Sequence, residues 1–258
     1  MDGAKILVFD IETYPDIPLI EAQGTNLSSF REQLKQETGT DFLPPIYHVP
    51  IALAVLKVER GFRELTTNVL TTSPGNESSL VEAFWRSCEE VLGTTDGREE
   101  GLLVSFNGMG FDVPVLELRA LKYALRGNTR ARDRRFHFDV PLFLANYESS
   151  RRRGLHLSTL SKLAGLPGKV LLDGGQVQSR FESGALDEIG RYCLLDVLET
   201  YLLFLRCQLL CGMNSGTYET AVRSFASFLN ASTDPSIRAL TPYLEEYLKG
   251  NAEVQFFR

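Results

Sequence analysis

Hydrophobic and polar positions at the start of the chain alternate with the spacing of β-strands. Residues 5–10 form an apolar, β-branched run of strand length, and the run delivers Asp10 and Glu12 just as it ends. These carboxylates are two residues apart, so they share one face of a strand, about 7 Å apart along it. Residues 51–58 and 62–70 are two more strand-like runs, separated by a short turn that contains Gly61. The pattern predicts an antiparallel sheet at the start of the chain.

The rest of the chain alternates between helical and strand spacing. Apolar positions three or four residues apart predict helices over residues 77–92, 113–126, 156–164 and 186–212, and a shorter helix over 27–37 within an insertion at 24–45. Short apolar runs at 102–106 and 136–140 predict strands. This order favours an α/β fold whose mixed sheet is antiparallel at the start and then parallel, flanked by helices. Amphipathic stretches at 217–229 and 235–248 predict a helical extension, so we divide the chain into a domain at 1–213 and an extension at 214–258, packed on the same domain.

Charge argues against a general binder of polyanions. The formal net charge is −6 and the sequence pI is about 5.3, so any contact with nucleic acid must come from a local basic patch. One such patch lies between Arg119 and Arg153, where ten Lys and Arg residues stand against three acids. A solvated surface is the alternative interpretation of the same charges.

Targeting signals and cysteine motifs are missing from the sequence pattern. The first residues lack the basic and then apolar layout of a signal peptide, and the longest apolar region, at 197–213, is interrupted by polar residues. The four cysteines form no CxxC pair, which is typical of reduced thiols. We therefore expect a cytoplasmic protein that does not enter a membrane.

Several acids stand where the predicted elements could bring them together. Asp112 follows a strand and opens a helix, and Tyr192 and Asp196 are four residues apart on one face of the longest predicted helix. If Asp10, Glu12, Asp112 and Asp196 converge, their mutual repulsion requires divalent cations. Hard oxygen ligands suit Mg²⁺ or Mn²⁺, and two such ions can stabilise the attacking and leaving oxygens of phosphodiester hydrolysis.

The motifs FDIET, NGMGFD and YCLLD resemble the three exonuclease motifs of the DEDD (DnaQ-like, RNase H-like) 3′-5′ exonucleases, in their tyrosine-containing subtype. The segments SFNGMGFDVPVLELRA, HFDVPLF, LSKLAGLPGK and IGRYCLLDVLETY are similar to the stand-alone bacterial group described as predicted family B polymerase-like 3′-5′ exonucleases. The similarity covers roughly residues 5–206. The histidine subtype carries its histidine five residues before the last aspartate, a position that is Arg191 here.

The resemblance assigns roles to the five motif residues. It implies that Asp10, Glu12 and Asp196 hold a first metal ion, that Asp10 bridges to a second, and that Asp112 holds the second mainly through water. It also implies that Tyr192 orients or helps to deprotonate the attacking water. Since a phenol with a reference pKa near 10 is a poor base at pH 7, we expect Tyr192 to orient the water.

The resemblance also implies a substrate and its contacts. We expect removal of nucleoside 5′-monophosphates from single-stranded 3′ ends, with DNA favoured over RNA, and a polymerase or repair protein as a partner in trans. A scaffold that binds nucleic acid with little turnover and an enzyme that trims RNA 3′ ends are the alternatives. The oligomeric state stays open. Expected contacts to nucleic acid are Thr13, Asn107 and Phe111 from the resemblance, and Arg119, Arg126 and Arg151 from the basic patch.

Two further expectations concern side chains outside the motifs. Asp139 either supports the metal site or caps the short helix that follows it. The three histidines, His48, His137 and His156, share no spacing, and we expect structural roles for them.

Overall fold

A computed structural model of the chain describes residues 5–93, 101–165, 176–242 and 244. The strands are β1 (Ile6–Pro15), β2 (His48–Glu59), β3 (Glu64–Thr71), β4 (Leu102–Ser105) and β5 (His137–Asp139). The α-helices are α1 (Ile17–Glu21), α2 (Leu27–Thr38), α3 (Ser78–Leu92), α4 (Asp112–Lys122), α5 (Val140–Leu144), α6 (Leu157–Leu163), α7 (Val177–Glu182), α8 (Leu186–Leu210), α9 (Ser215–Ala231) and α10 (Pro235–Arg238). Short 3₁₀ turns are η1 (Pro45–Tyr47), η2 (Thr129–Arg132) and η3 (Ser149–Arg152).

The strands form one mixed sheet in the order β3-β2-β1-β4-β5. The pairs β1–β2 and β2–β3 are antiparallel, whereas β1–β4 and β4–β5 are parallel. The predicted fold class is therefore confirmed. The predicted end of the first strand is wrong, because β1 continues past Asp10 to Pro15. It does so because β2 pairs with it along this whole length, through a register shift between Glu12 and Thr13.

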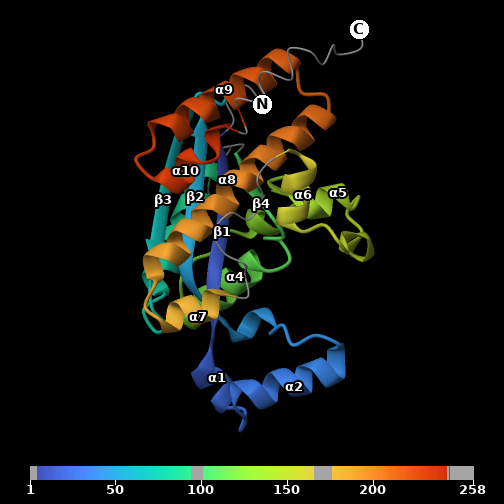
Figure 1. Cartoon of the computed structure of the whole chain (residues 1–258). Coiled ribbons are helices and arrows are strands. Elements are labelled where there is room, and N and C mark those ends of the chain that lie inside the picture. The colour runs from blue at the N-terminus through green and yellow to red at the C-terminus, as the bar shows by residue number, and fades with distance from the viewer. Residues whose placement is uncertain (1–4, 94–100, 166–175, 243, 245–258) are drawn as a thin grey trace.

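Each face of the sheet packs against its own layer of helices (Figure 1). Ile6 and Val8 of β1 lie in a core shared with α8 and α9, whereas Leu7 and Phe9 lie in a second core with α3 and α4. Alternation along the strand produces this separation. Since even-numbered residues of β1 face α8, the strand carries its next even-numbered side chains towards that helix.

Residues 16–47 form a separate structural feature between β1 and β2. They contain α1, α2 and η1, and they project from one end of the sheet (Figure 1). Arg119 of α4 connects this segment to the rest of the fold. Its guanidinium lies 2.7 Å from the Asp16 carboxylate and 3.5 Å from that of Glu77, and its Nε donates to the His48 carbonyl oxygen at 2.8 Å. We refer to residues 16–47 as the β1–β2 insertion.

The C-terminal helices share the core of the domain. The buried residues of α9, such as Phe225 and Leu229, belong to the same hydrophobic cluster as those of α8. The division at residue 213 stays a prediction. The predicted helix over 235–248 is interrupted, because α10 (Pro235–Arg238) is followed by a turn at 239–240 before residues 241, 242 and 244, which are helical. Residue 243 and residues 245–258 lie outside the described part of the chain. Residues 166–175, which include the LPGK part of one quoted segment, also lie outside it. Among the described helices, none is long and apolar enough to cross a membrane.

Candidate active site

Three carboxylates meet between the sheet and α8. Alternation along β1 carries Asp10 and Glu12 to the face that α8 covers, and Asp196 faces them from that helix. One carboxylate oxygen from each of these acids can be chosen so that all three lie within 4.8 Å of one another. Tyr192 lies one turn before Asp196, buried to 2% exposure. These four predicted residues are therefore neighbours in the fold.

Asp112 reaches the same region from the other side of β1. Its Oδ1 accepts a hydrogen bond at 3.1 Å from the backbone N–H of Ile11, the residue between Asp10 and Glu12. It is not one of the three acids whose oxygens lie within 4.8 Å, yet after burial its charge does most to raise the pKa of Asp10. Asp112 therefore adjoins the carboxylate cluster and fixes the backbone that presents it.

The early end of β4 opens the sheet beside these acids. β4 pairs with β1 only from Ile6 to Val8, so none of the described strands pairs with β1 on that side where Asp10 follows. The chain then turns through Asn107, whose φ of 69° is a left-handed conformation that asparagine tolerates better than most residues. Gly108 follows because a Cβ there would lie 2.5 Å from the Ser105 hydroxyl oxygen. The motif glycine is thus required by close packing.

A buried hydrogen-bond chain holds this turn. The Gly108 N–H donates to Ser105 Oγ at 3.0 Å, and Ser105 Oγ lies 2.7 Å from Nε2 of His137. His137 Nδ1 lies 2.7 Å from the Ala131 carbonyl oxygen, which can only accept, so Nδ1 carries the proton and Nε2 accepts from the serine. Burial lowers the pKa of His137 to about 4, which keeps the ring neutral at pH 7. His137 is structural, as expected.

Asp139 caps a helix and supports the same turn. Its Oδ1 accepts from the Leu142 N–H of α5 at 3.1 Å, and its Oδ2 accepts from the Met109 N–H at 3.0 Å. The capping interpretation of this residue is therefore confirmed. The negative charge of Asp139 also adds to the rise in the pKa of Asp112 that burial causes.

Burial and mutual repulsion shift the pKa values of the acids upward. Burial raises the pKa of Asp10 well above its usual range, and the charges of Asp112, Glu12 and Asp196 raise it further. Burial raises the pKa of Asp112 to about 7. The Cys193 thiol lies 3.5 Å from Asp10 Oδ2 and opposes part of this rise by donating to it. At neutral pH the metal-free cluster therefore retains protons that a divalent cation would displace.

Tyr192 is held in its neutral form. Burial raises the pKa of its hydroxyl, and the nearby charges of Asp196, Glu12 and Asp10 raise it further. A hydrogen bond between Tyr192 and Asp196 acts in the same direction. A group in this environment can donate to or orient a neighbour at neutral pH but cannot remove a proton from water.

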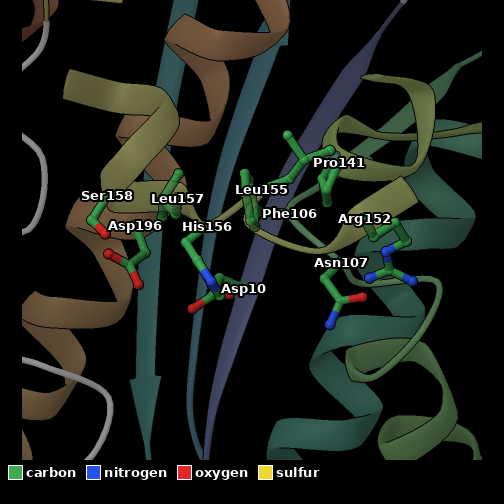
Figure 2. A pocket seen from close by; sticks show the side chains of 10 residues that line it. All are labelled: Asp10, Phe106, Asn107, Pro141, Arg152, Leu155, His156, Leu157, Ser158 and Asp196. Carbon is green, nitrogen blue, oxygen red and sulfur yellow. The ribbon is translucent and has the colours of Figure 1, made fainter. Parts of the chain in front are cut away.

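A cavity of about 500 Å³ opens beside the cluster. Asp10 and Asp196 line it together with Asn107, Arg152 and His156 (Figure 2). The Arg152 guanidinium packs against the 107–112 turn, where a Cβ added at Gly110 would lie 3.2 Å from Arg152 Nη1. In the sequence, Arg152 was one of ten basic residues of the patch and could not be told apart from the others. His156, for which we expected a structural role, also lines this cavity.

The residues predicted to contact nucleic acid are placed differently from one another. Asn107 lines the cavity beside Asp10, whereas Thr13 and Phe111 line a second cavity, which Glu12 also lines. Arg126 is exposed beyond the end of α4 opposite to Asp112, and Arg151 is exposed and forms an ion pair with Glu148 at 2.9 Å.

Arg119 does not fit the expectation that it contacts nucleic acid. It is 4% exposed and pairs with the buried acids Asp16 and Glu77. The physical reason is that this guanidinium compensates two carboxylates in the interior, so it is not available at the surface. Other members of the patch are also paired, as Arg132 is with Glu117.

The donor set fits a divalent cation. Carboxylate oxygens from Asp10, Glu12 and Asp196 are hard ligands of the kind that Mg²⁺ and Mn²⁺ prefer, and no lysine or arginine is among the five motif residues to compete for them. The cluster on this mixed sheet is therefore a candidate divalent-metal centre beside an open cavity.

The chain belongs to the family of predicted 3′-5′ exonucleases related to the exonuclease domain of PolB, whose family model matches residues 40–250. Asp112, Tyr192 and Asp196 lie within the matched residues, whereas Asp10 and Glu12 precede them. The resemblance to the predicted family B polymerase-like 3′-5′ exonucleases is therefore confirmed, whereas the tyrosine-containing subtype stays a prediction.

Solved structures of exonuclease I are similar to the chain at low identity. A product-bound structure of exonuclease I gives a TM-score of 0.36 and 13% identity over 82% of this chain and 49% of that chain. A structure of E. coli exonuclease I with a dT13 oligonucleotide gives a TM-score of 0.37 and 12% identity over 83% and 45%. The chain spans about half the length of these proteins. No curated protein sequence matches the chain.

Proposed function

We propose that this protein is a metal-dependent exonuclease of the tyrosine-containing DEDD subtype, which hydrolyses phosphodiester bonds at the 3′ ends of single-stranded nucleic acid, preferably DNA. It releases nucleoside 5′-monophosphates. The observation that carries the proposal is the convergence of Asp10, Glu12 and Asp196 beside an open cavity, in a chain that belongs to an exonuclease family.

The acids have distinct roles in this proposal. Asp10, Glu12 and Asp196 would hold one divalent cation, and Asp112, which adjoins them, would help to hold a second. Bound Mg²⁺ or Mn²⁺ would supply charge stabilisation to the attacking and leaving oxygens of the phosphodiester. The Ile11 N–H holds Asp112 in place at 3.1 Å, and Cys193 holds the Asp10 carboxylate. Both contacts reduce the reorganisation needed when the cations bind.

Tyr192 and Glu12 position the attacking water. Because its pKa is raised, Tyr192 keeps its proton and acts through hydrogen bonding, with Asp196 as its nearest carboxylate partner. Glu12 would accept a hydrogen bond from the water, since it lines the second cavity while its carboxylate lies within 4.8 Å of those of Asp10 and Asp196. The proton leaves towards this carboxylate and from there to solvent.

Arg152 and Asn107 contact the backbone of the bound strand. They line the cavity that contains Asp10 and Asp196, and an arginine fork matches the geometry of a phosphate. We therefore propose that Arg152 makes the phosphate contact. Arg151 does not line the cavity and pairs with Glu148. The net charge of −6 makes this local cation important for a polyanionic substrate.

Substitution of the acids tests the proposal. Asp10→Asn and Asp196→Asn should each abolish the Mg²⁺- or Mn²⁺-dependent degradation of a single-stranded oligonucleotide. Asp133→Asn is the matched control, because Asp133 pairs with Arg135 at the surface and should be dispensable. Retention of activity in either cluster variant would contradict the mechanism. A wild-type protein that binds the oligonucleotide equally well in EDTA and never degrades it would favour a scaffold instead.

A further inference from the structure

A second cavity, of about 510 Å³, is lined by Glu12 of the carboxylate cluster and not by Arg152. Glu12 and Thr13 of β1 form one wall, Phe111 precedes α4 on another, and Arg31 and Phe42 come from the β1–β2 insertion. Its volume is within the range of small-molecule sites in proteins. The mechanism proposed above uses Glu12 but gives no role to the other residues that line this cavity.

The aromatic ring of Phe42 is held in place by neighbouring rings but stays exposed to solvent. Phe42 is 59% exposed, which makes it one of the most exposed large hydrophobic residues described. The ring centroid nevertheless lies 5.3 Å from that of His48 and 5.3 Å from that of Phe111, and those two rings meet edge to face at 4.8 Å. A ring that is supported on one side and open on the other is suited to stacking on a nucleobase.

Thr13 presents an acceptor in the same cavity. His48 Nε2 lies 3.0 Å from the Leu43 carbonyl oxygen, which can only accept, so Nε2 carries the proton. His48 Nδ1, 2.8 Å from Thr13 Oγ1, must then accept the threonine proton. Burial lowers the pKa of His48, which keeps this arrangement at neutral pH. The Thr13 oxygen therefore offers its lone pairs to an outside donor such as a sugar hydroxyl.

The insertion is anchored beside the cavity by contacts at two places. Arg31 Nη2 of α2 donates to Gln178 Oε1 of α7 at 3.2 Å, and both side chains line the cavity. At the base, the ion pair of Arg119 with Asp16 fixes the start of the insertion. Phe42 is thus carried on a segment attached at two places, so stacking on it does not require a loop to become ordered.

We infer that the β1–β2 insertion contributes a stacking surface beside the metal centre, with Phe42 packing on the base of the terminal nucleotide. The resemblance already implies that Thr13 lies near this nucleotide. The inference rests on the proposed function and adds a substrate contact that the insertion makes. It predicts that the enzyme senses whether the terminal residue carries a base.

Paired substrates and variants test the stacking site. On a single-stranded oligodeoxynucleotide, Phe42→Ala should lower kcat/KM by roughly 5- to 150-fold, the range that corresponds to the 1–3 kcal/mol of base–aromatic stacking. On the same oligomer with an abasic 3′-terminal residue, wild type and Phe42→Ala should be equal within about twofold. Phe42→Trp should restore the preference for a base. Ile46→Ala is the matched control, because Ile46 is also an exposed apolar residue of the insertion and does not line the cavity.

The outcomes separate this inference from the proposed function. Equal losses on both substrates, no loss on either, or a loss in Ile46→Ala as large as in Phe42→Ala would overturn the stacking site while leaving the exonuclease intact. If the wild type degrades neither oligomer, the proposed function fails. Calorimetry with a nucleoside 5′-monophosphate and Mn²⁺ then decides, since weaker binding by Phe42→Ala supports the site, and equal or absent binding by both proteins overturns it.

Discussion

Replacing Asp112 with asparagine should make the metal-free protein more stable at alkaline pH. Asparagine keeps an oxygen that can accept from the Ile11 N–H, so the substitution removes a charge and little else. Burial raises the pKa of Asp112 from 3.8 to about 7 in the folded protein. Below pH 3.8 the carboxyl is protonated in both folded and unfolded states. As the pH rises towards 7, only the unfolded state ionises, so the folded state loses stability.

The magnitude follows from the interval between the two pKa values. Each pH unit in this interval is worth about 1.4 kcal/mol, so the cost of Asp112 is about 2 kcal/mol at pH 5 and about 4 kcal/mol at pH 8. In urea titrations with EDTA, Asp112→Asn should exceed wild type in the free energy of unfolding by these amounts.

Asp133→Asn is the control for this prediction. It should not increase the free energy of unfolding, because pairing with Arg135 lowers the pKa of Asp133 and the charged carboxylate stabilises the fold. A gain for Asp112→Asn that is the same at pH 5 and pH 8, or a loss at pH 8, would refute the view that this carboxyl is buried and repelled by its neighbours.

Three further substitutions test separate parts of the account. Arg152→Ala should lower kcat/KM roughly 10- to 150-fold, the equivalent of about 1.5–3 kcal/mol for a charge-assisted hydrogen bond. Arg151→Ala should stay within about twofold of wild type, and Arg152→Lys should recover part of the loss. Equal effects at both arginines would contradict the phosphate contact. Arg119→Met should reduce the free energy of unfolding by about 3–5 kcal/mol in denaturant titrations, because it leaves Asp16 and Glu77 uncompensated. The KM of the folded protein for oligonucleotide should not change. A raised KM at unchanged stability would contradict the structural role of Arg119. Tyr192→Phe should lower kcat by roughly 10- to 100-fold and leave the pH profile of kcat in place, because the neutral phenol only orients the water; loss of a basic limb from the profile would show that the phenol titrates.

The motif residues could be predicted because short-range periodicity determines them. Strand alternation fixes Asp10 and Glu12 on one face, and helical spacing fixes Tyr192 and Asp196 on another. The sequence did not reveal that β1 continues beyond these acids. That extension depends on pairing with β2, and the partner of each residue in a sheet lies far away in the sequence.

The basic residues show where sequence reasoning stops. Arg119 belongs to a basic run, but its partners Asp16 and Glu77 are 103 and 42 positions away and meet it only in the folded chain. Arg151 and Arg152 are adjacent and chemically identical, and only the turn of η3 places one at the cavity and the other in solvent. The charge pattern of the sequence therefore identified a basic region, but it could not show that Arg152 is the residue that lines the cavity with Asp10 and Asp196.

The products of a 5′-labelled single-stranded oligodeoxynucleotide provide the most direct test of the proposed chemistry. With Mn²⁺ or Mg²⁺, the label should stay on fragments that shorten one nucleotide at a time, and mass spectrometry should detect nucleoside 5′-monophosphates. EDTA should stop the reaction. Internal cuts, immediate release of the label, or nucleoside 3′-monophosphates would contradict the assignment of this carboxylate centre to 3′-5′ exonuclease activity.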